Sequence, residues 1–585
     1  MEPAQEYEAR LAWWRQAAEE GERAHRRAGN WRLLLAAALI TMAALLRNIV
    51  PVGFLLAAIF AGIFLTGFFH DRVLRRRDTA RRLVAFYVRG LDRLGHHWMG
   101  KGTQGAEFLA KEHPYAVDLD IFGAGSLFEL LNTAQTQAGS TRLAQWLLTG
   151  AERGEIVARQ GAVDAMRSNV DLREDLAVRA GDPREHIHTG ALMSWAARPA
   201  RLTGGFARAA GFCFPLLTWL SLAFRDFPLF AAALIAQCGF AYFYQRKNKA
   251  LVSGMLPSGE LRWLADVLMR LERENFEAPR LLELQAKWKR DEIAASASLR
   301  QLAGRVEWMD SCNNELLQML GPAVLLKTQF SFSVAAWHSR HGARIGEWLE
   351  ALGEMEALSS LAGYACEHPE DVFPKLGDSA SPIIDAQGLA HPLLAVAVRN
   401  DIALDASRPL HVISGSNMSG KSTWMRAIGV NIVLAMAGAP VRARACQMTA
   451  LRIGASMRTV DSLQEGVSRF YAEIKRLKQI VQMAVPGERV VFLIDEVFGG
   501  TNSHDRLIGA AFVVKLLVSR GAVGLITTHD LALTRVVDEV RPHGENFHFE
   551  DQLAEGKLSF DYRLREGVVQ KSNALDLMRS IGLDV

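Results

Sequence analysis

A glycine-rich run that begins at residue 415 has the composition and spacing of a phosphate-binding loop. Gly415, Gly420, Lys421 and Ser422 fit the pattern G-x-x-x-x-G-K-[ST], and an apolar run over residues 410–413 before them is typical of a strand. In such a loop backbone N–H groups surround the phosphates, the lysine contacts the β- and γ-phosphates, and the next hydroxyl binds Mg²⁺. The pattern predicts a nucleoside triphosphate site, whereas the alternative is a Gly/Ser-rich turn before an ordinary helix. The predicted binding residues are Gly415, Ser416, Asn417, Met418, Ser419, Gly420, Lys421, Ser422 and Thr423.

Two further apolar runs end in polar residues that suit catalysis. Residues 490–494 lead into Asp495 and Glu496, and residues 523–528 lead into His529. Open α/β sheets bind ligands at the carboxyl ends of their strands, so these side chains are expected beside the phosphate loop. There Asp495 would hold Mg²⁺, Glu496 would polarise the attacking water, and His529 would sense the γ-phosphate. The alternative for His529 is a polar residue that only ends a strand.

These segments resemble the ATPase domain of the MutS family of DNA mismatch-repair proteins. Other phosphate-loop families rarely place Asn-Met at positions 417 and 418, and the likeness continues through residues 461–473, 495–503 and 528–530. The resemblance implies two ATPase domains that face each other, with Ser468 of one subunit reaching the nucleotide of the other. The alternative for Ser468 is a helix N-cap.

A weaker likeness to the same family extends upstream. Residues 132–163 resemble the start of the family's helical core, and residues 354–362 resemble the helix that leads into the ATPase domain. Residues 251–365 are rich in Leu, Ala, Glu and Arg with helical periodicity, which predicts long helices. In the resembled family such helices are levers that carry a DNA clamp, and residues 258–362 are too few for a full clamp.

The sequence also departs from the family pattern. It contains no Phe-x-Glu, the element with which mismatch-recognising members wedge into DNA, and the usual mismatch-binding and connector domains have no room before residue 115. Mismatch recognition is therefore not expected. Phe498-Gly499 stands where the family usually has Gly-Arg, so a nucleotide-sensing arginine is missing there. The sequence ends soon after residues 567–583, which resemble the last shared helix, so dimerisation is expected through the ATPase faces or the membrane.

Four apolar runs predict two membrane-spanning hairpins. Residues 33–46 and 49–69 form the first pair, and residues 209–224 and 227–244 form the second. Twenty-one residues suffice to cross a hydrocarbon core of about 30 Å in a helix. Arginine and lysine gather at the outer ends of both pairs, which places those ends in the cytoplasm. The alternative is that the runs are buried core helices.

Charge and cysteine content indicate which ligands and partners are expected. A net charge of +4 with 22% charged residues is too mild to indicate a nucleic-acid binder, and the five cysteines lack metal-ligand spacing. The arginines over residues 72–82 flank a predicted span, which favours anionic lipid over nucleic acid as their partner. Residues 1–30 are charged with Leu11, Trp13 and Trp14 among them, which predicts an amphipathic helix rather than a cleavable signal.

Together these patterns predict a mixed fold. It has a mainly α-helical core with two transmembrane helical hairpins, and a C-terminal α/β phosphate-loop ATPase domain of ABC-like type. The predicted segments are 1–30, amphipathic; 31–70, first transmembrane hairpin; 71–208, first part of the helical core; 209–245, second transmembrane hairpin; 246–368, helical levers; 369–390, linker; and 391–585, ATPase domain.

The predicted function is a membrane-anchored ATPase that binds ATP and Mg²⁺ between two copies of the chain and uses hydrolysis to change conformation. It would be multi-pass in the cell membrane, with its N-terminus, core and ATPase domain in the cytoplasm, and associated with DNA. Two alternatives stay open. One is an ATP-driven machine for membrane remodelling or transport, although the spans carry no charged residue to mark a polar pathway. The other is a nucleotide-switched scaffold that does not bind DNA.

Overall fold

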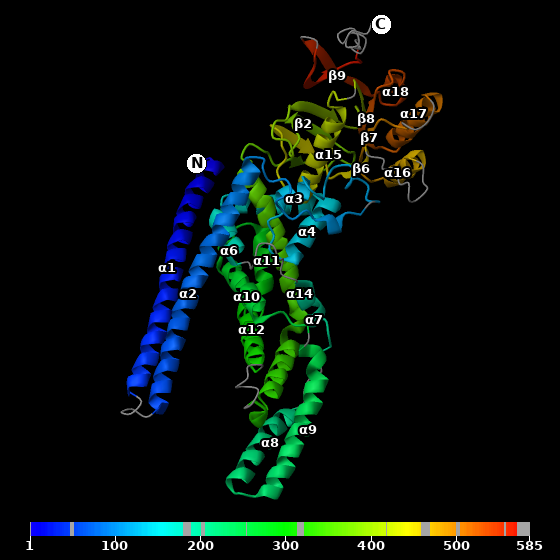
Figure 1. Ribbon diagram of the computed structural model, residues 1–585. Coiled ribbons are helices and arrows are strands. Elements are labelled where there is room, and N and C mark those ends of the chain that lie inside the picture. Colours follow the sequence, from blue (N-terminus) through cyan, green and yellow to red (C-terminus); the bar gives the residue numbers. More distant parts are fainter. Residues whose placement is uncertain are drawn as a thin grey trace.

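Helices fill the first two thirds of the chain and both β-sheets follow them (Figure 1). The structure is a computed structural model. It describes residues 2–46, 52–110, 112–179, 189–199, 205–252, 254–312, 321–416, 418–457, 469–498, 503–554 and 557–569.

Two long helices at the N-terminal end lie side by side, α1 (Pro3–Leu46) and α2 (Val52–Leu94) (Figure 1). Glu22 of α1 forms an ion pair with Arg81 of α2 at 2.8 Å. The predicted amphipathic segment and the apolar run after it therefore belong to one unbroken helix. The turn at residues 47–51, and most side chains of the run over 49–69, lie outside the described residues. The first membrane hairpin therefore stays a prediction.

The helical body is arranged around one long helix, α14 (Leu326–Glu367). At 1.5 Å per residue its 42 residues extend over about 63 Å. The predicted long helices over residues 251–365 are thus found as α14 and the helices before it. The other elements of the body are η1 (Ala106–Phe108), α3 (Leu127–Leu131), α4 (Gln137–Leu148), α5 (Arg153–Arg167), α6 (Val170–Arg179), α7 (Thr189–Ala196), α10 (Ser258–Arg273), α11 (Pro279–Lys289), α12 (Ala295–Ser311) and η2 (Gly321–Val324).

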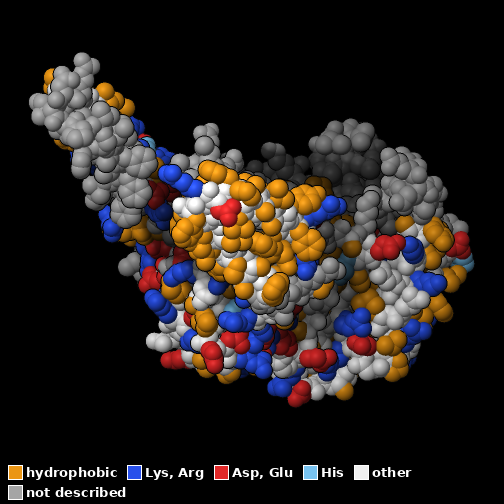
Figure 2. Space-filling view, turned by 90° about the horizontal axis from the view of Figure 1, so that it is seen from below, with side chains coloured by type: hydrophobic (Ala, Val, Ile, Leu, Met, Phe, Trp, Pro, Cys, Tyr) orange, Lys and Arg blue, Asp and Glu red, His pale blue; other side chains and the backbone are white. Residues whose placement is uncertain are grey.

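An apolar helix pair, α8 (Gly205–Ala223) and α9 (Phe227–Val252), projects from the far end of α14 (Figure 1). Two helices among the described residues are long and apolar enough to cross a membrane, over Phe206–Ala223 and Phe227–Lys247. Only 28% of the segment Phe206–Ala223 and 11% of the segment Phe227–Lys247 is buried, so these two helices are not buried core helices. Figure 2, which views the molecule from this end, shows hydrophobic side chains gathered over it with basic side chains at the border.

The C-terminal part contains two sheets. The larger has the order β10-β9-β4-β8-β7-β6, in which the five strands from β9 to β6 are parallel and β10 is antiparallel to β9. The smaller has the order β1-β5-β2-β3. The strands are β1 (Lys375–Leu376), β2 (Ile384–Leu389), β3 (Asn400–Leu404), β4 (Leu410–Ser414), β5 (Ala445–Met448), β6 (Arg452–Ser456), β7 (Val490–Asp495), β8 (Val523–Thr528), β9 (Glu545–Ala554) and β10 (Lys557–Glu566).

Helices cover both faces of the six-stranded sheet. Along β7, Val491 and Leu493 pack with the cluster that includes α15, whereas Phe492 and Ile494 pack with the cluster of α16 and α17. This alternation explains why the strand is apolar from Val490 to Ile494. The helices are α15 (Lys421–Ala437), α16 (Arg469–Met483), α17 (Ser503–Ser519), η3 (Leu533–Arg535) and α18 (Val536–Glu539).

Residues 369–390, predicted to be a linker, are part of the folded C-terminal body. β1 pairs with β5, and β2 lies between β5 and β3 in the smaller sheet. The linker signal came from Pro369, Pro374, Gly377 and Pro382, which lie in the connecting segments around these short strands. The hydrophobic core also continues from the helical body into this part, because α15 packs against α4 and α5.

Candidate functional site

The predicted phosphate loop connects the end of β4 to the start of α15. β4 ends at Ser414 and α15 begins at Lys421, so the loop lies at the N-terminus of a 17-residue helix. Gly420 has φ +103°, and a Cβ there would lie 2.9 Å from Cδ1 of Tyr562. Met418 also has a positive φ, 72°. The loop backbone is thus held in a shape that a side chain at Gly420 would disrupt.

Polar groups of this loop are buried and face one another. Ser419 is 1% exposed, and its hydroxyl, like the buried Oγ of Ser416, has no hydrogen-bond partner among the described residues. The Lys421 ammonium donates to the carbonyls of Gly415 at 2.9 Å and Ser416 at 2.8 Å. Buried hydroxyls normally find partners, so these two are free to bind a ligand with acceptor oxygens.

The acidic pair lies at the carboxyl end of β7, beside the loop. The hydroxyl of Thr527, on β8, donates to Asp495 Oδ1 and accepts from the Glu496 N–H at 3.1 Å. Glu496 has φ +48°, which is unusual outside glycine and concentrates at functional sites. Its Oε1 lies 3.9 Å from Lys421 Nζ and 3.7 Å from His529 Nδ1. Lys421, Asp495, Glu496 and His529 therefore meet at one edge of the sheet.

Two residues that the sequence did not single out complete this cluster. Arg506 of α17 brings Nη1 to 3.4 Å from His529 Nε2, and its buried Nε has no hydrogen-bond partner among the described residues. Glu473 of α16 accepts the Phe498 N–H at 2.5 Å and so fixes the turn that follows Glu496. Arg506 stands seven residues beyond Gly499, too far along the chain for spacing alone to connect it with the missing arginine.

A cleft of about 720 Å³ opens over the loop. This volume is within the range of roughly 300–1,000 Å³ that is usual for small-molecule sites. Its floor includes Lys421, Ser422, Thr423, Asp495 and Glu496, and its walls include apolar residues. The wall residues Leu394, Val396 and Tyr562 come from the segment before β3 and from β10, and the sequence motifs gave no signal for Val396 or Tyr562.

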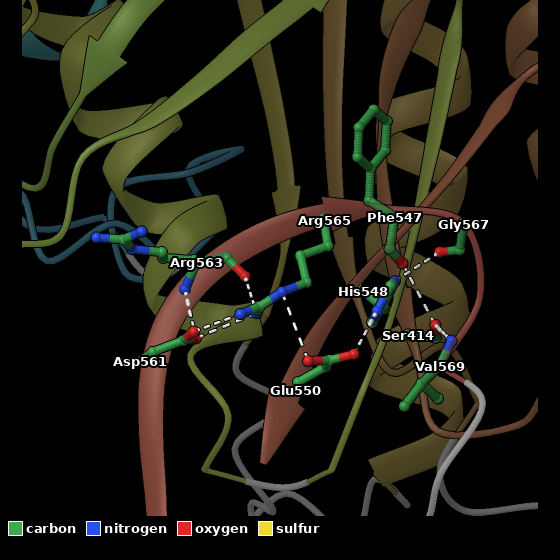
Figure 3. A network of polar contacts seen from close by, with 9 residues as sticks. All are labelled: Ser414, Phe547, His548, Glu550, Asp561, Arg563, Arg565, Gly567 and Val569. Carbon is green, nitrogen blue, oxygen red and sulfur yellow. Dashed lines mark hydrogen bonds and ion pairs between the residues drawn. The ribbon is translucent and has the colours of Figure 1, made fainter. Parts of the chain in front are cut away.

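A polar network fixes the strand that precedes the loop (Figure 3). The Ser414 hydroxyl donates to the Phe547 carbonyl at 3.3 Å and accepts the Val569 N–H at 3.2 Å. Further along β9, Glu550 lies 3.4 Å from His548 Nε2 and 3.5 Å from Arg565 Nε (Figure 3). The network joins β4, β9 and β10, so the wall that carries Tyr562 keeps its place over Gly420.

Burial sets the charge state of groups around the cleft. It lowers the pKa of the Lys421 ammonium, while the carboxylates of Glu496 and Asp495 act in the opposite direction. Burial, together with the charges of Arg426 and Arg442, lowers the pKa of His391 to about 4. His391 is therefore neutral at physiological pH and adds no positive charge to the cleft wall.

Some predicted site residues lie outside the described part. These are Asn417 of the loop, Ser468 with the segment before it, and residues 499–502 after the acidic pair. Ser422 and Thr423 line the cleft, and Met418 is 84% exposed at its rim.

Comparison with known proteins gives matches for the C-terminal part. The model of MutS domain V matches residues 411–584. "DNA mismatch repair protein MutS 2" of Halobacterium salinarum is 33% identical over 243 residues, which are 40% of this chain and 27% of that protein. "DNA mismatch repair protein MutS" of Natronomonas pharaonis is 32% identical over 255 residues, 41% of this chain and 28% of that protein, and that of Aquifex pyrophilus is 32% identical over 250 residues, with the same shares. The matched region spans little more than a quarter of these relatives.

Proposed function

Because the chain belongs to the MutS family through its C-terminal domain, we propose that this domain, predicted over residues 391–585, binds ATP and hydrolyses it. The observation that carries the proposal is the meeting of Lys421, Asp495 and Glu496 around a cleft whose loop hydroxyls, Ser416 and Ser419, are buried and have no partner within the described part of the chain. These are the groups that phosphoryl transfer requires, because its transition state is stabilised mainly by positioning and by charge.

Lys421 and the loop bind the triphosphate. The ammonium now bonds to two loop carbonyls, which a phosphate oxygen would replace as acceptors. The N-terminus of α15 adds its unpaired N–H groups and the positive end of its dipole. The hydroxyls of Ser416 and Ser419 supply further donors to the phosphate oxygens.

Glu496 orients and polarises the attacking water. Its carboxylate lies beside both Lys421 and His529, and its backbone is held by Thr527. His529, with Arg506 behind it, would detect the γ-phosphate from the side of β8. Arg506 is in a position to provide the positive charge that the Phe498-Gly499 departure removes.

The oxygen donors of Ser422 and Asp495 suit Mg²⁺, which prefers a few oxygen ligands from the protein and completes its shell with water and phosphate. When bound, the ion would neutralise charge that develops on the phosphates. Thr527 holds one Asp495 oxygen in place, so the carboxylate is already oriented before any ion binds.

The active form would be a homodimer through the ATPase domains, in which Ser468 of one copy reaches the nucleotide of the other. Apolar side chains on the elements around the site support such an interface, because they are exposed in the single chain. They are Met418 (84%), Tyr471 (62%), Ile508 (56%) and Phe512 (66%). Binding of ATP would close the dimer, and hydrolysis would open it.

The motion would act on DNA from a place on the membrane. The relatives are named for DNA mismatch repair, which favours DNA association, and the apolar pair α8–α9 favours a bilayer partner. The same pair favours a second candidate, an ATP-driven membrane-remodelling or transport machine, because it lies at the end of α14 that points away from the ATPase domain (Figure 1). Cytoplasmic placement of all soluble parts follows from the basic residues at the outer helix ends.

The first test is steady-state ATP hydrolysis by the full chain in lipid nanodiscs. Lys421→Ala should abolish nucleotide binding, whereas Lys475→Ala, which removes an exposed lysine on α16, should behave as the unchanged protein. Turnover by Lys421→Ala at the unchanged rate would overturn the site. A very slow but Lys421-dependent rate would favour the nucleotide-switched scaffold.

A second test separates the DNA and membrane functions. Binding of homoduplex, mismatched and branched DNA is measured across a salt series in the presence of ATP and Mg²⁺. A steep fall in affinity with salt supports a DNA-handling ATPase. No binding at low salt, with hydrolysis intact and dependent on lipid, supports the membrane machine.

A further inference from the structure

The apolar pair α8–α9 buries three polar side chains, and one of them, Gln237, bonds a third element. Thr218 and Ser221 of α8 are 7% and 3% exposed, and Gln237 of α9 is 1% exposed, whereas most of both helices is bare. Burying an amide in an apolar setting is costly unless every polar atom finds a partner. The hydrogen-bond partners of these side chains therefore identify the element that packs against α8 and α9.

All polar atoms of Gln237 are satisfied. Its Oε1 accepts from the Thr218 hydroxyl at 2.8 Å, and its Nε2 donates to the carbonyls of Pro322 at 2.7 Å and Ala323 at 3.3 Å. The indole of Trp219 donates to the same Ala323 carbonyl at 3.3 Å. Pro322 and Ala323 belong to η2, the short 3₁₀ turn directly before α14. The two helices of the apolar pair thus donate hydrogen bonds to backbone carbonyls of this 3₁₀ turn.

The beginning of α14 packs against the same pair. A Cβ at Gly211 of α8 would lie 2.7 Å from Gln329 Nε2, so the two helices approach closely at this glycine. The Phe332 ring meets Tyr244 of α9 edge-on at 5.2 Å and Phe240 at 6.3 Å. Small residues and interhelical hydrogen bonds of this kind are typical of helices that associate within a bilayer.

The contacts also set the depth of η2. Gln237 lies near the middle of the apolar window Phe227–Lys247. Thr328, in the first turn of α14, lies 3.5 Å from Gln245, close to the basic end of that window. From Thr328 to η2 the chain therefore runs from the basic end of α9 to its midpoint. Lys327 falls at the level of the basic end, where a lysine can extend its ammonium to the lipid headgroups.

We propose that η2 and the first turn of α14 enter the lipid bilayer together with α8 and α9, as a re-entrant third element. The inference rests on the proposed membrane attachment and names the part of the chain that enters with the hairpin. Backbone outside an α-helix at membrane depth is tolerated only where protein groups satisfy it. In η2 the Leu325 N–H and Gln237 bond the Pro322 carbonyl, and Gln237 and Trp219 bond the Ala323 carbonyl. The outward residues of η2, Pro322 and the 47% exposed Val324, would face lipid.

Through α14, this arrangement connects the ATPase domain mechanically to the element proposed to enter the membrane. α14 runs without a break from Leu326 to Glu367, and Leu325, with φ +53°, is the single residue between it and η2. The chain then enters the sheet-bearing part through the bridge between Val372 and Val441. A tilt of α14 driven from the ATPase domain would therefore move η2 within the bilayer through this one-residue connection.

The test measures the depth of spin labels in nanodiscs of phosphatidylcholine with anionic phosphatidylglycerol, using the full chain with its five cysteines replaced by serine or alanine. Labels are placed at Val324→Cys, at Ile235→Cys, which is 73% exposed in mid-α9, and at Val396→Cys, which is 91% exposed in the ATPase cleft. We expect the labels at 324 and 235 to collide more often with dissolved oxygen, which concentrates in lipid, than with a water-soluble nickel complex. The label at 396 should collide more often with the nickel complex.

The two proposals fail differently. An aqueous signal at both 324 and 235 would overturn the membrane attachment and the third element with it. A lipid signal at 235 with an aqueous signal at 324 would overturn the third element alone.

A matched pair of variants tests the role of Gln237. Gln237→Leu removes the bonds to Pro322 and Ala323, so the label at 324 should gain mobility and shift toward water. Gln245→Leu, on the same helix, loses one contact at 3.5 Å and should leave the label unchanged. An unchanged label in both variants would show that Gln237 does not hold η2 at depth, and would contradict the proposal.

Discussion

Removing the hydroxyl of Thr527 is the most selective way to perturb the acidic pair, Asp495 and Glu496. It donates to Asp495 Oδ1 and accepts the Glu496 N–H, so it orients both proposed functional carboxylates. Thr527→Val keeps the shape of a fully buried side chain and removes only these two bonds. Thr528→Val is the matched control, since Thr528 is also buried on β8 but its hydroxyl accepts the Asp530 N–H and donates to the Asp530 carbonyl instead.

The two variants should differ less in the free energy of unfolding than in the rate of ATP hydrolysis. Losing a hydrogen bond to a carboxylate and leaving the Glu496 N–H unpaired should destabilise the fold by about 1–3 kcal/mol. The control loses two neutral bonds, each about 0.5–1.5 kcal/mol. Turnover should separate them further, because misplacing a catalytic group by 1 Å can cost about 10²-fold. We expect the ATP hydrolysis rate to fall about 10- to 100-fold in Thr527→Val and less than about 3-fold in Thr528→Val.

Steady-state hydrolysis at saturating ATP and Mg²⁺, alongside thermal unfolding, checks this. Equal rates in the two variants at equal folded fraction would refute the reasoning that Thr527 positions the carboxylates. A rate loss in Thr527→Val that higher Mg²⁺ restores would assign the effect to Asp495, and one that Mg²⁺ leaves unchanged would assign it to Glu496.

Three further predictions follow from individual contacts. Burial raises the pKa of Glu356 on α14 to about 7, so the folded state retains a proton that the unfolded state releases above its ordinary pKa of 4.5. The free energy of unfolding should therefore fall by about 3 kcal/mol between pH 4.5 and 7. Thermal unfolding of Glu356→Gln, followed over the same pH range, should lack this dependence. Arg506→Ala should lower ATP turnover at least about 10-fold with nucleotide affinity retained, whereas an unchanged rate would remove Arg506 from the His529 cluster. A Cβ at Gly429 would lie 2.6 Å from Leu119, so Gly429→Val should lower the unfolding temperature by overpacking α15 against the helical body, at a cost of about 1–3 kcal/mol.

Local sequence signals predicted the strands that carry the candidate site. β4, β7 and β8 are apolar runs that end in polar residues, and a strand buried on both faces must be apolar throughout. The long helices were predicted equally well, since their periodicity is a local property. The phosphate loop spacing gave Lys421 and Ser422 for the same reason.

Features that depend on pairing across the chain were not predicted. β2 has the sequence Ile-Asp-Ala-Gln-Gly-Leu, which lacks an apolar run, and it is a strand because β3 and β5 pair with it. Arg506 reaches His529 only through the packing of α17 on the sheet. Gln237 looks like a lone polar residue in an apolar run, and its partner carbonyls lie 85 and 86 residues further along.

The most direct test of the central claim is a single-turnover measurement on Glu496→Gln in nanodiscs. The carboxylate is 39% exposed, so the substitution should leave folding nearly unchanged, and general-base catalysis contributes about 10²- to 10⁴-fold. We predict that ATP stays bound, that phosphate release slows by that factor, and that the chain remains a dimer in the presence of ATP. Phosphate release at the rate of the unchanged protein, or a monomer with ATP bound, would contradict the account.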